Sequence, residues 1–291
     1  MKKSEKIGMV VGLYPHQYKI EDPRLNKPVC HQKIEKGQVS GSMLLQDFDT
    51  ARIDNGKEIT YFCPNNIALL LSINSKALER AKALYSDYFL NSLNEFKLEQ
   101  IEGDKKKSLN KISSKVCDYI ECLQTAIVFG YTSVETFVNL SIPNEYTFET
   151  KNDSKGIKET YDKAAIERWL SLKMKLQYVL KEIYKTKNPE SQKWWGHFSN
   201  LEEYRNEIIH QKSIKSTSFY KAYFKKSIFQ ACESPLSVFR FFYETHAENN
   251  RTNPIWPWLV NDKNYFPVNL QYDSQDFEVI GNVHEGIKKK N

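Results

Sequence analysis

The chain has 291 residues, of which 40% are hydrophobic and 27% are charged, a profile typical of a soluble globular protein. Its net charge of +6 is mild, so it suits an RNA or anionic partner without requiring one. No stretch approaches the roughly 20 apolar residues of a membrane span, and the start of the chain lacks the apolar core of a signal peptide. We therefore expect a cytoplasmic protein that is not bound to a membrane.

The cysteines predict neither disulfides nor a metal site. There are five of them, an odd number, and none forms a Cys-x-x-Cys pair, which favours reduced thiols. Cys30, His31 and Cys63 offer three zinc ligands, and this alternative stays open, although no second closely spaced pair completes such a site. We expect no metal and no cofactor.

The first 70 or so residues predict a small β-containing arm. Residues 38–47 and 58–63 have the length of strands, and residues 6–13 form a short apolar run. Asp54-Asn55-Gly56 lies between the two strand-length segments and is typical of a hairpin turn.

Helical periodicity begins near residue 75 and continues through most of the chain. Apolar residues recur at intervals of three to four, which predicts helices over residues 75–101, 108–140 and 161–185. A fourth helical stretch begins near Ser191 or Ser199. A fifth region, residues 217–248, predicts two helices separated at Ser234-Pro235.

These elements predict a mainly α fold with an up-and-down helical bundle at its centre. The expected domains are a β-containing arm over residues 1–70, the bundle over residues 71–250, and an irregular C-terminal extension over residues 251–291. The extension contains three prolines, a strand near residues 277–283, and a basic end.

The segment Arg205-Asn206-Glu207-Ile208-Ile209-His210 carries the most distinctive chemistry. On a helix at about 100° per residue, Leu201, Tyr204 and Ile208 form a packing face. Asn206 and His210 are four residues apart, so they lie together on roughly the opposite face. Arg205 is about 100° from Asn206 and is long enough to reach it.

These residue types suit cleavage of an RNA phosphodiester. An imidazole such as that of His210 can take a proton from a 2′-hydroxyl or give one to the departing oxygen. The Arg205 guanidinium matches phosphate oxygens, and Asn206 can orient the imidazole or hold a phosphate oxygen. No carboxylate cluster lies nearby, which fits a metal-independent route. The spacing also allows a structural alternative, in which Arg205 pairs with Glu202 or Glu203 and His210 simply meets water.

The segment resembles the Arg-(four to six residues)-His motif of the HEPN superfamily, in which a polar residue, commonly Asn, follows the Arg. In that family the motif lies late in a helical bundle, after a long helix with an inner acidic residue, a place that Glu135 occupies here. The resemblance covers about residues 75–248. It implies a homodimeric, metal-independent endoribonuclease with a composite active site, in which Arg205, Asn206 and His210 are catalytic and Glu135 supports Arg205. Glu135 suits this role by hydrogen-bonding Arg205 and fixing its rotamer, with a glutamate on the helix surface as the alternative.

The same resemblance implies cleavage through a 2′,3′-cyclic phosphate, RNA as the substrate, and a toxin or antiviral-defence role with an antitoxin or other regulatory partner. The alternative is a HEPN-like module that binds nucleotides, RNA or a protein without cleaving. A scaffold in which the motif is accidental is a third reading.

Two neighbouring segments offer further candidates. Five lysines and no acidic residue lie between Gln211 and Cys232, and of these we expect Lys212, Lys215 and Lys221 to bind RNA, with a solvated helix face as the alternative. Aromatic residues interleave with these lysines and are typical of core packing.

Trp194-Trp195-Gly196-His197 precedes the motif. Its tryptophans suit either base stacking or helix packing. His197, expected just before the helix, is a candidate second catalytic group.

Overall fold

The protein is mainly helical, with small sheets near its N-terminus, as the sequence predicts. The contacts within the chain divide it into two compact units. The first unit contains Met1–Leu69, Thr136–Lys187 and Phe239–Asn291, and the second contains Leu70–Glu135 and Asn188–Val238. None of the helices described is long and apolar enough to cross a bilayer. The computed structural model describes residues 8–13, 22–25, 29–91, 97–150, 158–210, 218–247 and 279–284.

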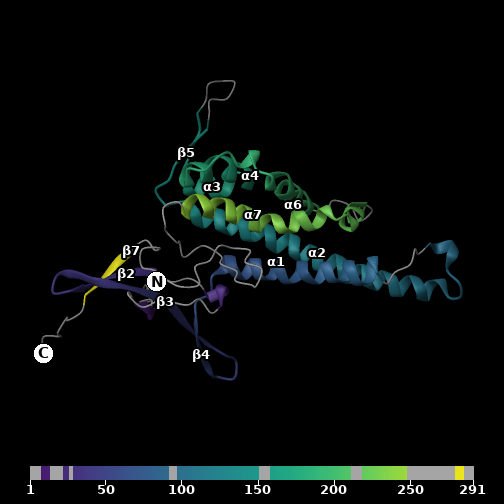
Figure 1. The fold of residues 1–291 in the computed structure, drawn as a ribbon, viewed down its shortest axis with the longest axis horizontal. Coiled ribbons are helices and arrows are strands. Elements are labelled where there is room, and N and C mark those ends of the chain that lie inside the picture. The colour runs from purple at the N-terminus through teal and green to yellow at the C-terminus, as the bar shows by residue number, and fades with distance from the viewer. Residues whose placement is uncertain are drawn as a thin grey trace. The chain divides into compact units, whose positions relative to one another are not determined.

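A five-stranded sheet in the first unit is organised around β3 (Figure 1). Its strand order is β1-β3-β2-β7, and β4 pairs with the second half of β3. β7 runs parallel to β2, whereas the other pairs are antiparallel. The strands are β1 (Gly8–Leu13), β2 (Val29–Glu35), β3 (Gln38–Arg52), β4 (Glu58–Phe62) and β7 (Val279–His284).

Two turns fix the register of the β3 hairpins. Lys36 and Gly37, both at positive φ, form the two-residue turn between β2 and β3. Before β4, Gly56 also has positive φ, and the Asn55 side chain accepts the Lys57 amide at 3.1 Å. The predicted hairpin is therefore confirmed, although β3 extends beyond the predicted end at residue 47.

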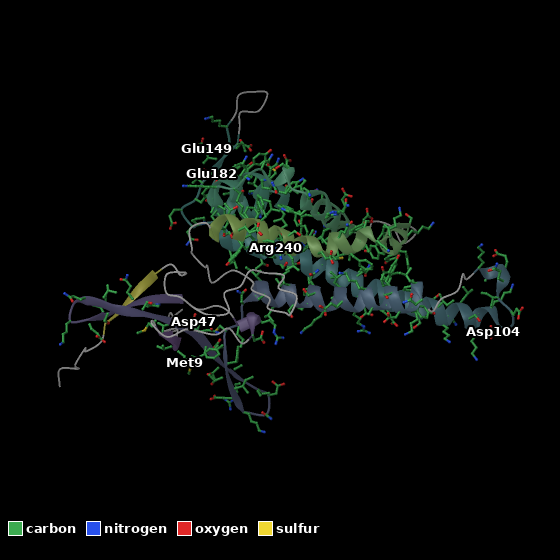
Figure 2. All side chains as sticks on the ribbon, in the orientation of Figure 1. Met9, Asp47, Asp104, Glu149, Glu182 and Arg240 are labelled. Carbon is green, nitrogen blue, oxygen red and sulfur yellow. The ribbon has the colours of Figure 1, made fainter. Side chains whose placement is uncertain are left out.

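Several large apolar side chains of this sheet are exposed to solvent. The Met9 side chain on β1 is 52% exposed, and Figure 2 shows it standing out from the strand. The predicted strand near residues 277–283 is confirmed as β7, although its first two predicted residues lie outside the described part of the chain. The residues from 248 to 278 also lie outside it, and the predicted domain boundaries stay predictions.

The single helix predicted over residues 161–185 is wrong, because the backbone breaks at Leu170 and Ser171. Leu170 is extended, and the Ser171 hydroxyl accepts the Met174 amide at 3.3 Å, which starts a new helix. The extended backbone at Leu170 and the Ser171 cap thus interrupt the helix although the apolar periodicity runs through the break. The segment consists of strand β6 (Thr160–Tyr161), α3 (Lys163–Trp169), α4 (Leu172–Met174), a π-helical turn (Lys175–Leu180) and α5 (Lys181–Tyr184). β6 pairs with the short β5 (Phe148–Glu149).

Three helices of the second unit, α1, α2 and α7, also supply residues to the first. Helix α1 (Asn66–Ala83) begins about nine residues earlier than predicted, because the Asn65 side chain caps it by accepting the Ala68 amide at 3.2 Å. A π-helical turn (Leu84–Leu90) follows, and residues 92–96 lie outside the described part. The long helix predicted over residues 108–140 is confirmed as α2 (Lys105–Ser141).

The remaining helices of this unit are α6 (Trp194–Ile209), a 3-10 helix (Ser218–Phe224) and α7 (Ser227–Ala247). The predicted separation of two helices at Ser234-Pro235 is wrong, since α7 continues through Pro235. Pro235 has no amide to bond the Ala231 carbonyl, but the Ser234 hydroxyl donates to that oxygen at 2.7 Å and replaces the missing bond.

The core of the second unit centres on Asn74, which is buried where three helices meet. Its side-chain amide donates to the Ala126 carbonyl of α2 at 2.7 Å and to the Cys232 carbonyl of α7 at 3.2 Å. Tyr119 and Leu123 of α2 are fully buried in the same core. α1 and α2 lie side by side here (Figure 1).

Gly130 is the position on α2 where this packing leaves least room. A Cβ there would come within 2.7 Å of the Asn74 amide nitrogen and 3.1 Å of Pro235 Cγ. We expect Gly130→Ala to lower the free energy of unfolding by about 1–3 kcal/mol because it overpacks this contact. Gly196 on α6 is the matched control, since a Cβ there meets nothing within 4 Å and Gly196→Ala should raise stability by roughly 0.5–1 kcal/mol. Urea denaturation measures both, and equal effects would contradict the close packing at Gly130.

Candidate functional site

Helix α6 presents the motif as the sequence predicts, with one packed face and one exposed face. Leu201 is fully buried, and Tyr204 and Ile208 are half-buried. Asn206 and His210 are exposed. The predicted packing face is therefore confirmed, and the polar residues of the motif lie on the face turned away from the core.

The Arg205 guanidinium is held by two contacts within the second unit. It lies over the ring of Tyr131 at 5.1 Å from the ring centroid, and its Nη1 donates to Asn206 Oδ1 at 3.1 Å. Among the described residues no carboxylate pairs with it, so the alternative of an ion pair with Glu202 or Glu203 is not formed. Most of its N–H donors are therefore available to an anion.

Tyr131 of α2 is the residue that positions Arg205, and sequence reasoning missed it. Its ring is 7% exposed and stacks on Phe198 of α6, with centroids 6.1 Å apart and planes 5° from parallel. Its hydroxyl donates to Glu202 Oε1 at 3.2 Å. The sequence does contain a signal for Tyr131. It lies four residues before the candidate Glu135, so the helical spacing places the two side chains on nearly the same face of α2.

The pKa of Tyr131 is raised above its usual value of 10.0, first by burial and then by the negative charges of Glu202 and Glu135. The positive charge of Arg205 opposes this shift. The hydroxyl, protonated at neutral pH in any case, therefore stays protonated into alkaline solution and continues to donate to Glu202 there.

His210 lies at the end of α6, one turn after Asn206. Its backbone amide still donates to the Asn206 carbonyl at 2.9 Å, but its backbone leaves the helix at φ −114° and ψ 33°. The structure therefore brings the Arg205 and Asn206 side chains into contact, and places the exposed His210 at the end of the same helix, one turn further along the chain. Residues beyond His210 as far as 217 lie outside the described part of the chain.

Glu135 is half-buried on α2, one turn after Tyr131. Among the described contacts of Arg205 none involves Glu135, whose charge acts on the Tyr131 hydroxyl instead. The expected hydrogen bond from Arg205 to Glu135 is therefore replaced by the contact with the Tyr131 ring.

The charge of α6 does not by itself attract a polyanion. Glu202, Glu203 and Glu207 surround Arg205 in the sequence of this helix. Phosphates that approach Arg205 thus need positive charge from other elements.

The predicted RNA-binding lysines are only partly described. Lys221 is exposed on the 3-10 helix, and Lys212 and Lys215 lie outside the described residues. The neighbouring aromatic residues pack inward, as expected. Tyr223 is fully buried against Tyr204, and Phe224 contacts Tyr119.

The Trp194-Trp195-Gly196-His197 segment forms the first turn of α6, so the expectation that His197 precedes the helix is wrong. Both tryptophan rings contact the buried Phe198, with centroids 6.4 and 6.5 Å away, which favours the packing role. His197 is half-buried in this turn.

Among the described residues no three His, Cys, Asp or Glu side chains gather into a potential metal site. The side chain of Cys30 is outside this description, so the Cys30–His31–Cys63 alternative is not tested. Comparisons with protein-family models, curated proteins and solved structures gave no match to this chain. The HEPN resemblance therefore rests on the residues of the motif.

The raised pKa of Tyr131 predicts how stability changes at alkaline pH. Above about pH 10 the unfolded tyrosine loses its proton while the folded one keeps it, so the free energy of unfolding falls as pH rises. We expect Tyr131→Phe to remove this contribution and make the decline shallower by up to about 1.4 kcal/mol per pH unit. Urea denaturation between neutral pH and pH 11 measures it, and parallel curves for the two proteins would contradict the assignment.

Proposed function

We propose that this protein is a metal-independent endoribonuclease of the HEPN type that cleaves RNA through a 2′,3′-cyclic phosphate. The observation that carries the proposal is the arrangement on α6. Arg205 is fixed by Tyr131 and Asn206 without a carboxylate partner, beside the exposed Asn206 and His210. A guanidinium held without neutralisation suits phosphate recognition.

In the proposed reaction the 2′-oxygen of the substrate attacks the adjacent phosphorus. A neutral imidazole of His210 takes the proton of the 2′-hydroxyl, and a protonated imidazole gives a proton to the departing 5′-oxygen. Arg205 stabilises the added negative charge on the phosphoryl oxygens. Asn206 orients Arg205 through the hydrogen bond between them.

Two imidazoles are needed for this division of roles, and each chain supplies one His210. The proposed enzyme is therefore a homodimer in which the exposed faces of two α6 helices form one composite site. The resemblance further implies a toxin or antiviral-defence effector, under the control of an antitoxin or other regulatory protein.

The test is cleavage of single-stranded RNA by the purified protein in EDTA. We expect His210→Ala to reduce the cleavage rate by at least about 100-fold, because general acid–base catalysis contributes that much or more. His197→Ala tests the other histidine of the same helix: because His197 lies in the first turn of α6 and His210 at its end, we expect this variant to retain cleavage, and a loss of cleavage would instead assign the second imidazole to His197.

Undiminished cleavage by His210→Ala would refute the assignment of His210. RNA binding without any cleavage by the unaltered protein would instead favour the non-catalytic module. Mass spectrometry of the products tests the proposed route, because attack by the 2′-oxygen leaves a cyclic phosphate, whereas direct attack of water on the phosphorus does not.

The composite site also predicts the oligomeric state. Light scattering should give twice the mass of the chain. Asn206→Asp should weaken the dimer, because it places one added negative charge from each chain at the interface. A monomer that cleaves RNA would contradict the composite site.

A further inference from the structure

The first three turns of α2 form a strongly basic surface in the second unit. Between Lys105 and Cys117 there are five lysines and no acidic residue. All five side chains are exposed: Lys105, Lys106, Lys107, Lys111 and Lys115. The helix starts after Asp104, labelled in Figure 2, whose carboxylate accepts the Lys107 amide at 3.0 Å.

Three of these lysines form one stripe along the helix. Lys107, Lys111 and Lys115 are spaced by four residues, so each lies about 6 Å further along α2 with only about 40° of rotation. We call these three residues the lysine stripe. Of the three, Lys115 forms an ion pair with Asp118 at 3.4 Å, and the side chains of both residues are substantially exposed.

The lysines oppose the stability of the helix that carries them. The N-terminus of a helix has a partial positive charge, which favours acidic residues, yet the first turn of α2 contains Lys105, Lys106 and Lys107 and no acidic residue. Their mutual repulsion and the helix dipole both act against this turn. The Asp104 carboxylate at the cap offsets part of both effects, and a bound polyanion would offset more.

We infer that the lysine stripe binds the phosphates of the single-stranded RNA substrate. This inference rests on the proposed function and names the surface that attracts the substrate. It supplies the positive charge that α6 lacks, since Arg205 is accompanied there by three glutamates. A row of cations that follows the backbone of the strand is a common means of binding without sequence preference.

An RNA partner fits this surface better than a membrane does. Within Lys105–Cys117 the apolar side chains are Leu109, which is 38% exposed, and Ile112 and Val116, which are half-buried, and further along α2 the core buries the apolar face fully. The stripe segment thus offers one partly exposed leucine to a bilayer, whereas an interfacial membrane helix presents a broad apolar face. The stripe offers charge alone, which is the requirement for a phosphate backbone.

The experiment measures fluorescence anisotropy of a labelled single-stranded RNA over a series of salt concentrations in EDTA. The protein carries His210→Ala so that the RNA stays intact. We expect K107Q/K111Q/K115Q to reduce the magnitude of the slope of log affinity against log salt concentration by about 2, because each lost phosphate contact accounts for roughly 0.7. At 0.1 M salt the same variant should bind the RNA roughly 10- to 100-fold more weakly.

The matched control is K57Q/K181Q/K187Q, which removes the same charge from three exposed lysines elsewhere. Its affinity and salt slope should be close to those of the protein with His210→Ala alone. The thermal midpoint provides a second readout: Lys107→Gln should raise it slightly while weakening RNA binding, because the lysine acts against the helix dipole.

Unchanged RNA affinity in the stripe variant, or equal weakening in the control, would overturn the inference. Binding to phosphatidylcholine–phosphatidylserine vesicles that depends on the stripe, with RNA affinity unaltered, would overturn it in favour of a membrane. The proposed function fails separately: stripe-dependent RNA binding without cleavage by the unaltered protein leaves the inference standing and refutes the nuclease.

Discussion

The buried amide of Asn74 is the constraint on which the second unit depends. A buried polar group must be hydrogen-bonded, and this amide is satisfied only where the backbones of α2 and α7 both approach α1. Gly130 allows that approach because it has no side chain toward Asn74 and Pro235. The next residue on α2 is Tyr131, so the same close packing sets the position of the ring on which Arg205 rests.

Helix α7 shows how this constraint is compatible with a proline inside a helix. The Ser234 hydroxyl satisfies the Ala231 carbonyl, so the helix continues and keeps Cys232 beside Asn74. A helix end at this point would have removed the second acceptor of the buried amide. The serine that precedes the proline is thus part of the packing arrangement of the unit.

Long apolar periodicity and turn chemistry predicted α2, the β3–β4 hairpin and the exposed face of α6. Local hydrogen bonds decided the features that periodicity missed: the Asn65 cap that starts α1 early, the Ser171 cap that divides the third predicted helix, and the Ser234 bond that joins α7. The pairing of β7 with β2 joins segments about 250 residues apart, which no local pattern encodes. Tyr131 was missed for a related reason, because its contact with Arg205 depends on how α2 and α6 pack together.

The way in which Arg205 is held determines what it can bind. An aromatic ring attracts a guanidinium through its quadrupole and adds no formal charge, whereas a carboxylate partner would neutralise it. The Tyr131 ring is neutral at physiological pH, as in any tyrosine, and burial and the nearby glutamates raise its pKa so that it stays neutral into alkaline solution; its hydroxyl donates to Glu202. Arg205 therefore keeps its charge within an acidic helix. This arrangement lets Arg205 recognise a phosphate at short range on α6. The long-range attraction of a polyanion must then come from positive charge on other elements.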